Sequence, residues 1–490
     1  MSIGKLSLIS IGKENIFLSG YPEITYFKIV YKRYTNFSIE PLPQYFKTTP
    51  DFGRRCTINI GKNADLINKM YLYVELPAIN NNNTIKFKWV DKIGIALINF
   101  IDIEINGNII DRHYGDWINI WNEITINNGI RKSYNNIIGN IRYLTNYSSS
   151  KNNYTLYIPL SFWFCLDTGL ALPLISMSYS DIKIHVDFND INLCYNSSPS
   201  NYISVTNNYC IYESGELFYQ KYKNNEIIGE FIYFDPINKL IYYNPIKNTL
   251  IIPNNDNYNK LKLIGKISNF ECNIVINSTI IKNNDYFNFN KPSILSAYLL
   301  VDYIYLDNFE RGQFINKNHE YIIQVIQTLP EQIINSVNAI YKLPLYNPIK
   351  LLIWRTLLTS NNNSNKFFNY TDNINSDIKK SNQLINKNLL IINSINRMDL
   401  SSIEYYTNIQ SYQYNLINNQ KGIYMYSFAL NPLQLQPSGS MNFSKIDDAY
   451  LQLTMNNNVN YQNKVSLKAY AIQYNLFRVS NGIAGLGFNI

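Results

Sequence analysis

The chain has 490 residues, of which 46% are hydrophobic and 16% are charged, and its formal net charge is +8. This length can bury two moderate cores, so two domains are the natural expectation. A net charge of this size is explained by ordinary solvated surface residues. It therefore disfavours a protein that binds nucleic acid in a basic groove.

The five cysteines are odd in number and widely spaced, with no C-x-x-C pair of the kind found in zinc and redox sites. They are Cys56, Cys165, Cys194, Cys210 and Cys272. We expect reduced core thiols, and a bond between Cys194 and Cys210 is the open alternative. Lys5, Lys13 and Glu14 interrupt the apolar N-terminus, so we expect no secretion signal, no membrane span and folding in a reducing compartment.

Residues 1–24 are predicted to form an N-terminal arm. The overlapping stretch YPEITYFKIVYKRYTNFS, Tyr21 to Ser38, mixes aromatic with basic side chains. Such a mixture can stack on bases and bind phosphates. We favour a strand or arm that packs its rings inward and keeps its basic tips in water.

Short alternating runs follow, separated by Gly, Pro and Asn. Cys56–Ile60, Leu72–Leu76 and Ile101–Ile105 each place apolar residues on one side and polar or wetter residues on the other. This period of two is typical of half-buried strands. Asn106-Gly107 suits a tight hairpin turn. Antiparallel sheets stacked face to face satisfy this pattern, whereas a parallel sheet would need continuous apolar runs and intervening helices.

One helix is predicted among these strands. Trp117, Ile120, Trp121 and Ile124 recur at helical spacing, and Asp116 before them is a candidate N-cap. Two tryptophans on one stripe could form a sugar platform, but we interpret them as a packed face. Strands resume over Leu156–Leu166 and Ile182–Phe188, and the second of these alternates strictly.

The second half of the chain repeats this kind of pattern. After a last strand-like run of the first half, Tyr209–Tyr222, the pattern restarts with a strand-like run over Ile294–Leu306. A helix is then predicted around Tyr321, Ile322, Val325 and Ile326. The polar insertion Thr359–Gln420 predicts a long surface loop. Gly422–Thr454 predicts two strands joined across a stiff corner, because Pro432 and Pro437 cannot donate to a ladder.

Two parts of the first half have counterparts in the second. Strands followed by a helix occur at Ile101–Ile124 and again from Ile294, and the run Tyr157–Phe188 is echoed by Tyr424–Leu453. We interpret this as an internal duplication at a period of roughly two hundred residues, which fits two copies of one sandwich domain.

A search for catalytic or metal-binding motifs gives negative results. His319-Glu320 fails the zincin pattern at Ile323. His185 and Asp187 share a strand face and could offer two metal ligands, although a solvated or inter-subunit pair is favoured. The glycines Gly482, Gly485 and Gly487 predict a flexible tail, and His113 has no partner at helical spacing. We therefore predict no enzyme and no catalytic, cofactor-binding or metal-binding residue.

Several of these stretches, Tyr21 to Ser38 among them, resemble a known family. IPLSFWFCLDTGLALPLISMSYSDIKIHVDF and YSFALNPLQLQPSGSMNFSKIDDAYL are similar to segments of the major capsid proteins of nucleocytoplasmic large DNA viruses, of the mimivirus and chlorovirus type. The resemblance implies an all-β double jelly roll, two tandem eight-stranded sandwiches with short helices in the connections. Residues 25–222 would form the first jelly roll, and residues 223–490 the second, with the surface loop 359–420.

The resemblance also implies a function and partners. A homotrimer would form a pseudo-hexagonal capsomer that tiles an icosahedral shell, in contact with neighbouring capsomers, minor capsid and penton proteins and an internal membrane-associated layer. Sequence-specific nucleic-acid binding is not expected. The protein would reside in the virion capsid after folding and assembly in the host cytoplasm. A trimeric attachment or carbohydrate-binding protein is the alternative, and a glycan-active enzyme would need two carboxylates converging in a cleft.

Overall fold

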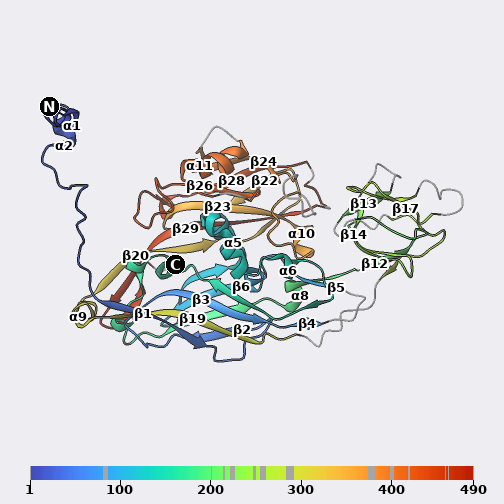
Figure 1. Ribbon diagram of the computed structural model, residues 1–490, viewed down its shortest axis with the longest axis horizontal. Helices are drawn as coiled ribbons and strands as arrows, with labels where there is room; N and C mark the ends of the chain where they lie inside the picture. Colours follow the sequence, from blue (N-terminus) through green and yellow to red (C-terminus); the bar gives the residue numbers. More distant parts are fainter. Residues whose placement is uncertain are drawn as a thin grey trace.

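The computed structural model describes most of the chain, and strands dominate the part that it describes. The described residues are 2–80, 86–199, 201–212, 216–220, 227–246, 250–253, 261–282, 292–372, 381–397, 402–417, 420–457, 459–461 and 463–488. Figure 1 shows two stacked β-sandwiches, a smaller β unit to one side and an N-terminal arm that projects away from both.

The first sandwich consists of two four-stranded antiparallel sheets. Their orders are β1-β19-β3-β9 and β2-β10-β6-β7. The strands are β1 Phe37–Tyr45, β2 Arg55–Asn59, β3 Leu66–Leu76, β6 Ile98–Ile105, β7 Asn108–Tyr114, β9 Tyr154–Pro159, β10 Ile182–Phe188 and β19 Ser296–Leu306. Inward side chains such as Leu72, Ile103 and Ile184 are fully buried between the sheets. This strand order is that of a jelly roll.

The second sandwich repeats the first strand by strand. Its sheets have the orders β20-β29-β23-β26 and β22-β28-β24-β25. The strands are β20 His319–Thr328, β22 Asn338–Lys342, β23 Pro348–Leu358, β24 Ile385–Ile392, β25 Ile395–Asn396, β26 Ile423–Ser427, β28 Ala449–Met455 and β29 Val465–Ser480. Short strands β21 Gln332–Ile334, β27 Met441–Asn442 and β30 Ile483–Leu486 extend the first of these sheets. The predicted double jelly roll is confirmed.

Apart from α1 and α2, which lie in the N-terminal arm, the helices and remaining short strands lie in the connections, as expected. The helices are α1 Ile3–Ile9, α2 Asn15–Ser19, α3 Ile93–Ala96, α4 Gly115–Thr125, α5 Asn128–Ile137, α6 Arg142–Thr145, α7 Trp163–Leu166, α8 Ile191–Cys194, α9 Asn308–Asn316, α10 Thr359–Asn363 and α11 Gln410–Gln413, with a π-helical turn η5 at Tyr405–Ile409. The strands are β4 Ile79–Asn80, β5 Lys86–Trp89, β8 Ser150–Lys151 and β11 Tyr195–Ser198. The predicted strand over Leu156–Leu166 therefore ends at Pro159, and α7 follows it.

The structure confirms one of the two predicted internal echoes. β9 and β26 are both edge strands of the first sheet of their sandwich, and β10 and β28 are both central in the second sheet. The corner between β26 and β28 therefore crosses from one sheet to the other. The other echo is wrong, because β6 corresponds in sheet position to β24, whereas β19 corresponds to β29.

The strand β19 places part of the predicted second domain in the first sandwich. It pairs with β1, where Tyr298 lies opposite Tyr45, and with β3, where Tyr298 lies opposite Tyr73. The predicted boundary at residues 222 and 223 therefore does not separate the two jelly rolls. Alternation within a strand reveals its two faces but not its partner, which explains the error.

Residues 201–282 form an inserted β unit between β10 and β19. Its sheet has the order β17-β16-β13-β14-β15-β12-β18. The strands are β12 Asn201–Ser204, β13 Leu217–Gln220, β14 Ile227–Asp235, β15 Leu240–Pro245, β16 Leu263–Gly265, β17 Glu271–Cys272 and β18 Ile281–Lys282. A bridge between Val205 and Ile274 joins the two ends of this sheet around a separate core. Among the described residues of the predicted strand Tyr209–Tyr222, only β13 is a strand.

The predicted helix around Tyr321 is wrong. These residues lie in β20, and the helix in this region is α9, which ends before them. Ile323 and Val325 face the core of the first sandwich, while Ile326 packs under α4. Because both faces of β20 are covered from Ile323 onward, this part of its sequence lacks the alternation of a half-buried strand.

The predicted surface loop Thr359–Gln420 also contains core structure. β24 pairs with β28, and its Leu390 is fully buried. Asn361 and Tyr370, which also belong to this polar insertion, have no exposed surface. Residues 373–380, 398–401 and 418–419 of the insertion lie outside the described residues.

The N-terminal arm is longer than predicted and its rings are exposed. The described arm covers residues 2–36, with α1 and α2 as its only helices among those residues, and the first strand begins at Phe37. Phe27 is 98% exposed, and Tyr26, Tyr31 and Tyr34 are also exposed. The expectation of inward-packed rings is wrong, because the arm projects away from the sandwiches (Figure 1).

All five cysteines are free thiols. Cys194 lies in the core of the first sandwich, whereas Cys210 packs against the core of the inserted unit, so the alternative of a bond between them is wrong. Burial raises the pKa of the Cys194 thiol. The Sγ atom of Cys210 instead lies 3.8 Å from that of Cys272.

Candidate assembly surfaces

The helix α4 joins the two jelly rolls. It follows β7 of the first sandwich and lays Trp117, Ile120 and Ile124 on the outer face of the sheet β20-β29-β23-β26 of the second. Ile353 and Tyr470 on that face are fully buried. The tryptophan stripe is thus a packed face, as predicted.

A buried ion cluster lies beside this helix. An Oδ2 atom of Asp116 in α4 lies 3.0 Å from Nη2 of Arg355 in β23 and 3.4 Å from Nζ of Lys468 in β29. Burial alone would raise the pKa of Asp116, but the charges of Arg355 and Lys468 outweigh it, and the pKa is lowered. Asp116 lies in the first turn of α4, and the N-cap is Tyr114, so the predicted capping role is wrong.

His185 and Asp187 do not converge on a metal site. Nε2 of His185 lies 2.9 Å from a Glu104 oxygen, and its Nδ1 lies 2.8 Å from the Thr57 hydroxyl. Asp187 accepts a separate hydrogen bond from Asn99 at 2.7 Å. Within the described ranges, no three metal-ligating side chains gather in one place. Hydrogen bonds from Lys183 and His185 lower the pKa of Glu104, so these residues form a hydrogen-bonded network across a sheet face.

The other two histidines also have structural partners. Nε2 of the buried His113 lies 2.9 Å from Oδ2 of Asp111, and Oδ1 of Asp111 accepts a hydrogen bond from the backbone of Ile326 in the second sandwich. Nε2 of His319 lies 2.8 Å from the carbonyl oxygen of Phe314. These contacts fix connections and the junction between the sandwiches.

The glycine-rich C-terminus is not a flexible tail over its described part. β30 contains Gly485 and pairs with β29 in a hairpin whose turn holds Gly482 at a φ of 80°. The positive φ explains a glycine at this turn.

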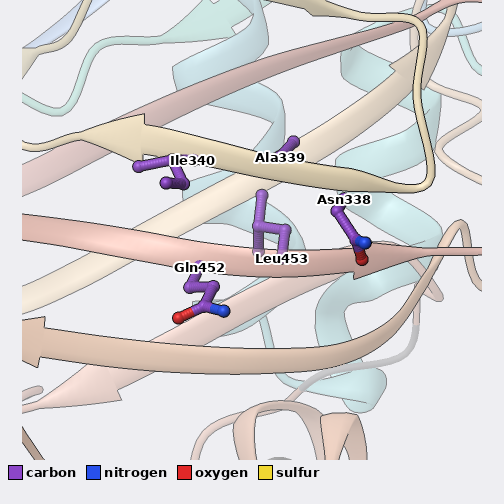
Figure 2. A pocket seen from close by; sticks show the side chains of 5 residues that line it. All are labelled: Asn338, Ala339, Ile340, Gln452 and Leu453. Atoms are coloured by element: carbon purple, nitrogen blue, oxygen red, sulfur yellow. The ribbon is translucent and has the colours of Figure 1, made fainter.

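A surface hollow lies over β22 and β28 of the second sandwich. Figure 2 shows the five side chains that line it. They are Asn338, Ala339, Ile340, Gln452 and Leu453. None of these five is an acid, a base or a nucleophile at neutral pH, so the hollow has no group suited to acid–base catalysis.

Four tyrosines form a continuous row on the outer face of the first sandwich. Tyr45, Tyr298, Tyr73 and Tyr157 lie directly opposite one another on β1, β19, β3 and β9. Successive ring centroids are 5.7, 4.3 and 5.2 Å apart. Tyr45 is 68% exposed and Tyr157 is 37% exposed.

A second apolar row runs beside the tyrosines. Pro43, Leu300, Tyr71 and Pro159 are paired across the same four strands. We call these two rows the tyrosine face. The sequence contained a signal for it, because Tyr71 and Tyr73 occupy alternate, solvent-side positions of β3, where polar residues are usual.

Comparisons with known proteins agree with this fold. Residues 25–235 match the family described as "Major capsid protein N-terminus", and residues 310–485 match "Large eukaryotic DNA virus major capsid protein". The chain belongs to the major capsid proteins of large eukaryotic DNA viruses. As a member of this family it is a structural component of the viral capsid.

Relatives of this capsid protein match it over the full length. "Probable capsid protein 4" of Acanthamoeba polyphaga mimivirus is 35% identical and is aligned over 100% of this chain and 99% of its own. The major capsid protein of Phaeocystis pouchetii virus is 27% identical, with 100% of both chains covered.

Solved structures share the fold of this capsid protein. The PBCV-1 virus capsid chain aligns with a TM-score of 0.64 at 21% identity, covering 95% of this chain and 100% of that one. The Faustovirus major capsid protein aligns with a TM-score of 0.67 at 12% identity, covering 96% and 94%. No helix among the described residues of this capsid protein is long and apolar enough to span a bilayer.

Proposed function

We propose that three copies of this chain form a pseudo-hexagonal capsomer that tiles the icosahedral shell of a large double-stranded DNA virus. The observation that supports this proposal is the tandem repetition of one jelly roll, with the two copies held together by α4 and the Asp116–Arg355 pair. Three such chains present six similar sandwiches, which can be arranged in a ring by cyclic symmetry.

The proposal extends to partners and location. The capsomer contacts neighbouring capsomers, minor capsid and penton proteins and an internal membrane-associated layer, and it binds no specific nucleic-acid sequence. The exposed apolar side chains of arm residues 2–36 suit such protein or membrane contacts. Folding and assembly take place in the host cytoplasm before incorporation into the virion.

We further propose that the protein has no enzymatic activity. Ionisable side chains such as Asp116 and Glu104 are engaged in structural pairs with basic side chains. The alternative of a trimeric attachment or carbohydrate-binding protein is less well supported, because the family similarity extends over both sandwiches rather than over one recognition domain.

The mass in solution tests the capsomer proposal. Light scattering coupled to size exclusion should give three chains of 57.2 kDa, roughly 170 kDa together, and negative-stain images should show hexagonal outlines. A single-chain mass of 57.2 kDa at every concentration up to the micromolar range would contradict the proposal.

A further inference from the structure

The tyrosine face has an equivalent within the same chain. On the second sandwich the corresponding row consists of Thr328, Tyr470, Ile353 and Met425, paired across β20, β29, β23 and β26. The strand order is the same as in the first sandwich. Tyr470, Ile353 and Met425 are fully buried because α4 and its neighbours cover this face. The second sandwich therefore shows that a helix such as α4 can cover the outer face of this sheet.

The tyrosine face itself is open to solvent in the single chain. Its rows are bounded by polar residues, with Glu75 and Ser296 on one side and Lys69 and Asp302 on the other. An exposed apolar patch with a polar rim is typical of a protein interaction site. Because aromatic rings bury large areas at little entropic cost, such a row is well suited to an interface.

The second sandwich has a helical segment at the position that α4 holds in the first. Residues 402–417, which we call the outer segment, connect β25 to β26, as residues 115–153 connect β7 to β9. Tyr406 anchors the outer segment in the core of the second sandwich. Tyr412, on the other side, is 89% exposed, and Ile409 is half exposed.

The outer segment and the tyrosine face lie on opposite sides of the molecule. Figure 1 shows α11 at one end of the stack of sandwiches and β1 and β19 at the other. One chain therefore cannot bring its own two surfaces together. Two unlike surfaces at opposite ends produce head-to-tail contacts, which close into a ring when the rotation between copies allows it.

We propose that the tyrosine face binds the outer segment of a second copy of this chain, with Tyr412 and Ile409 against the tyrosine row. In this contact the outer segment of one chain covers the tyrosine face of another chain, just as α4 covers the outer face of the second sandwich within one chain. This inference rests on the proposed capsomer and identifies the surfaces that join its subunits.

Photo-crosslinking tests this contact directly. Tyr412 is replaced by p-benzoylphenylalanine in the full chain, and the trimer is irradiated and analysed on a denaturing gel and by peptide mass spectrometry. We expect products of two-chain mass with crosslinks to peptides that contain Tyr45, Tyr73, Tyr157 or Leu300. The same residue at the exposed Ile237 of the inserted unit serves as the control and should give none of these crosslinks. Crosslinks from position 412 to other regions, or none between chains, would overturn the proposal.

Substitutions on the tyrosine face provide a second test. The variant Tyr73→Lys/Tyr298→Lys should weaken association at least tenfold, as measured by light scattering over a dilution series. Its circular dichroism should match the wild type, because both side chains point out of the sandwich. The exposed Tyr461→Lys should associate like the wild type.

The outcomes separate this inference from the proposed function. A wild-type trimer whose Tyr73→Lys/Tyr298→Lys variant remains trimeric leaves the capsomer intact and overturns the tyrosine contact. A wild-type monomer contradicts both. Binding of oligosaccharides to the tyrosine face of the trimer, detected by glycan array and abolished in the same variant, would show a carbohydrate occupant and overturn the proposal.

Discussion

Lys350 is a buried lysine without a carboxylate among its described partners. Its Nζ donates to Oε1 of Gln324 at 2.7 Å, and the side chain has almost no exposed surface. Burial lowers the pKa of Lys350 to about 7. The unfolded chain therefore holds more protons than the folded chain between about pH 7 and the ordinary lysine pKa near 10.4.

This imbalance predicts a pH-dependent stability. Because the unfolded state binds the additional proton, the free energy of unfolding should rise with pH between about 7 and 10, by at most about 1.4 kcal/mol per pH unit from this group. Lys350→Met should reduce the slope of unfolding free energy against pH in denaturant titrations. Lys151, whose pKa burial lowers to about 8, should leave a residual slope. The exposed control Lys342→Met should retain the wild-type slope; an unchanged slope in Lys350→Met would contradict the prediction.

Asp116 and Arg355 illustrate the cost of separating a buried ion pair. Asp116→Asn should lower the free energy of unfolding by about 3–5 kcal/mol, because Arg355 stays buried without its main counter-charge. The lowered pKa of Asp116 means that its contribution is present above about pH 4 and is lost as pH falls through the folded pKa. Hence the wild type and Asp116→Asn should converge in stability at low pH.

Chemical denaturation at pH 7 and pH 3 measures this difference. Asp447→Asn, at an exposed position, is the matched control and should change stability by less than about 0.5 kcal/mol. Asp116→Asn/Arg355→Met should recover part of the loss, since the unpaired charge is gone. Equal stability of Asp116→Asn and the wild type at pH 7 would show that the pair does not hold the sandwiches together.

At the scale of elements, the inserted β unit begins and ends at one place. Asn201 of β12 lies opposite Lys282 of β18, and Tyr202 lies opposite Ile281. The unit also has its own core, built around residues such as Phe218 and Leu263. Inserted units whose ends are adjacent can be removed with little effect on the host domain.

Excision of the inserted unit should therefore leave the double jelly roll intact. Replacing residues 203–280 with Asn-Gly should connect the paired ends through a two-residue hairpin turn. We expect a soluble trimer with a cooperative unfolding transition, checked by light scattering and calorimetry. Deletion of 296–306 is the contrasting control and should abolish folding, because β19 is central in its sheet. An excised variant that aggregates would show that the unit supports the first sandwich.

Local patterns in the sequence predicted the elements that have one dry face. The alternation of Ile101–Ile105 and Ile182–Phe188 identified β6 and β10, and the stripe from Trp117 to Ile124 identified α4. The same reasoning failed for β20, which is covered on both faces from Ile323 onward, and for β24, which lies inside a polar insertion. These strands are buried by elements that are distant in the chain, and a short window of sequence contains no information about such elements.

At the scale of the whole molecule, the repetition of the sandwich was easier to predict from the sequence than the pairing of its strands. The resemblance of Tyr157–Phe188 to Tyr424–Leu453 indicated two sandwiches, and the structure places both segments equivalently. The partner of β19 was not predictable from its residues, because pairing with β1 joins segments more than two hundred positions apart. The tyrosines of β3 alone do not reveal the tyrosine face either, since its row exists only once four distant strands are aligned.

The position of β19 has a consequence for biosynthesis. A ribosome that has released β1, β3 and β9 has not yet delivered the strand that must lie between β1 and β3. In the nascent first sandwich the edges of β1 and β3 therefore remain unpaired until the entire inserted unit has been synthesised. Unpaired strand edges are prone to associate with other chains. During translation the inserted unit can therefore complete its fold before the first sandwich does, because its sheet is formed by its own strands alone.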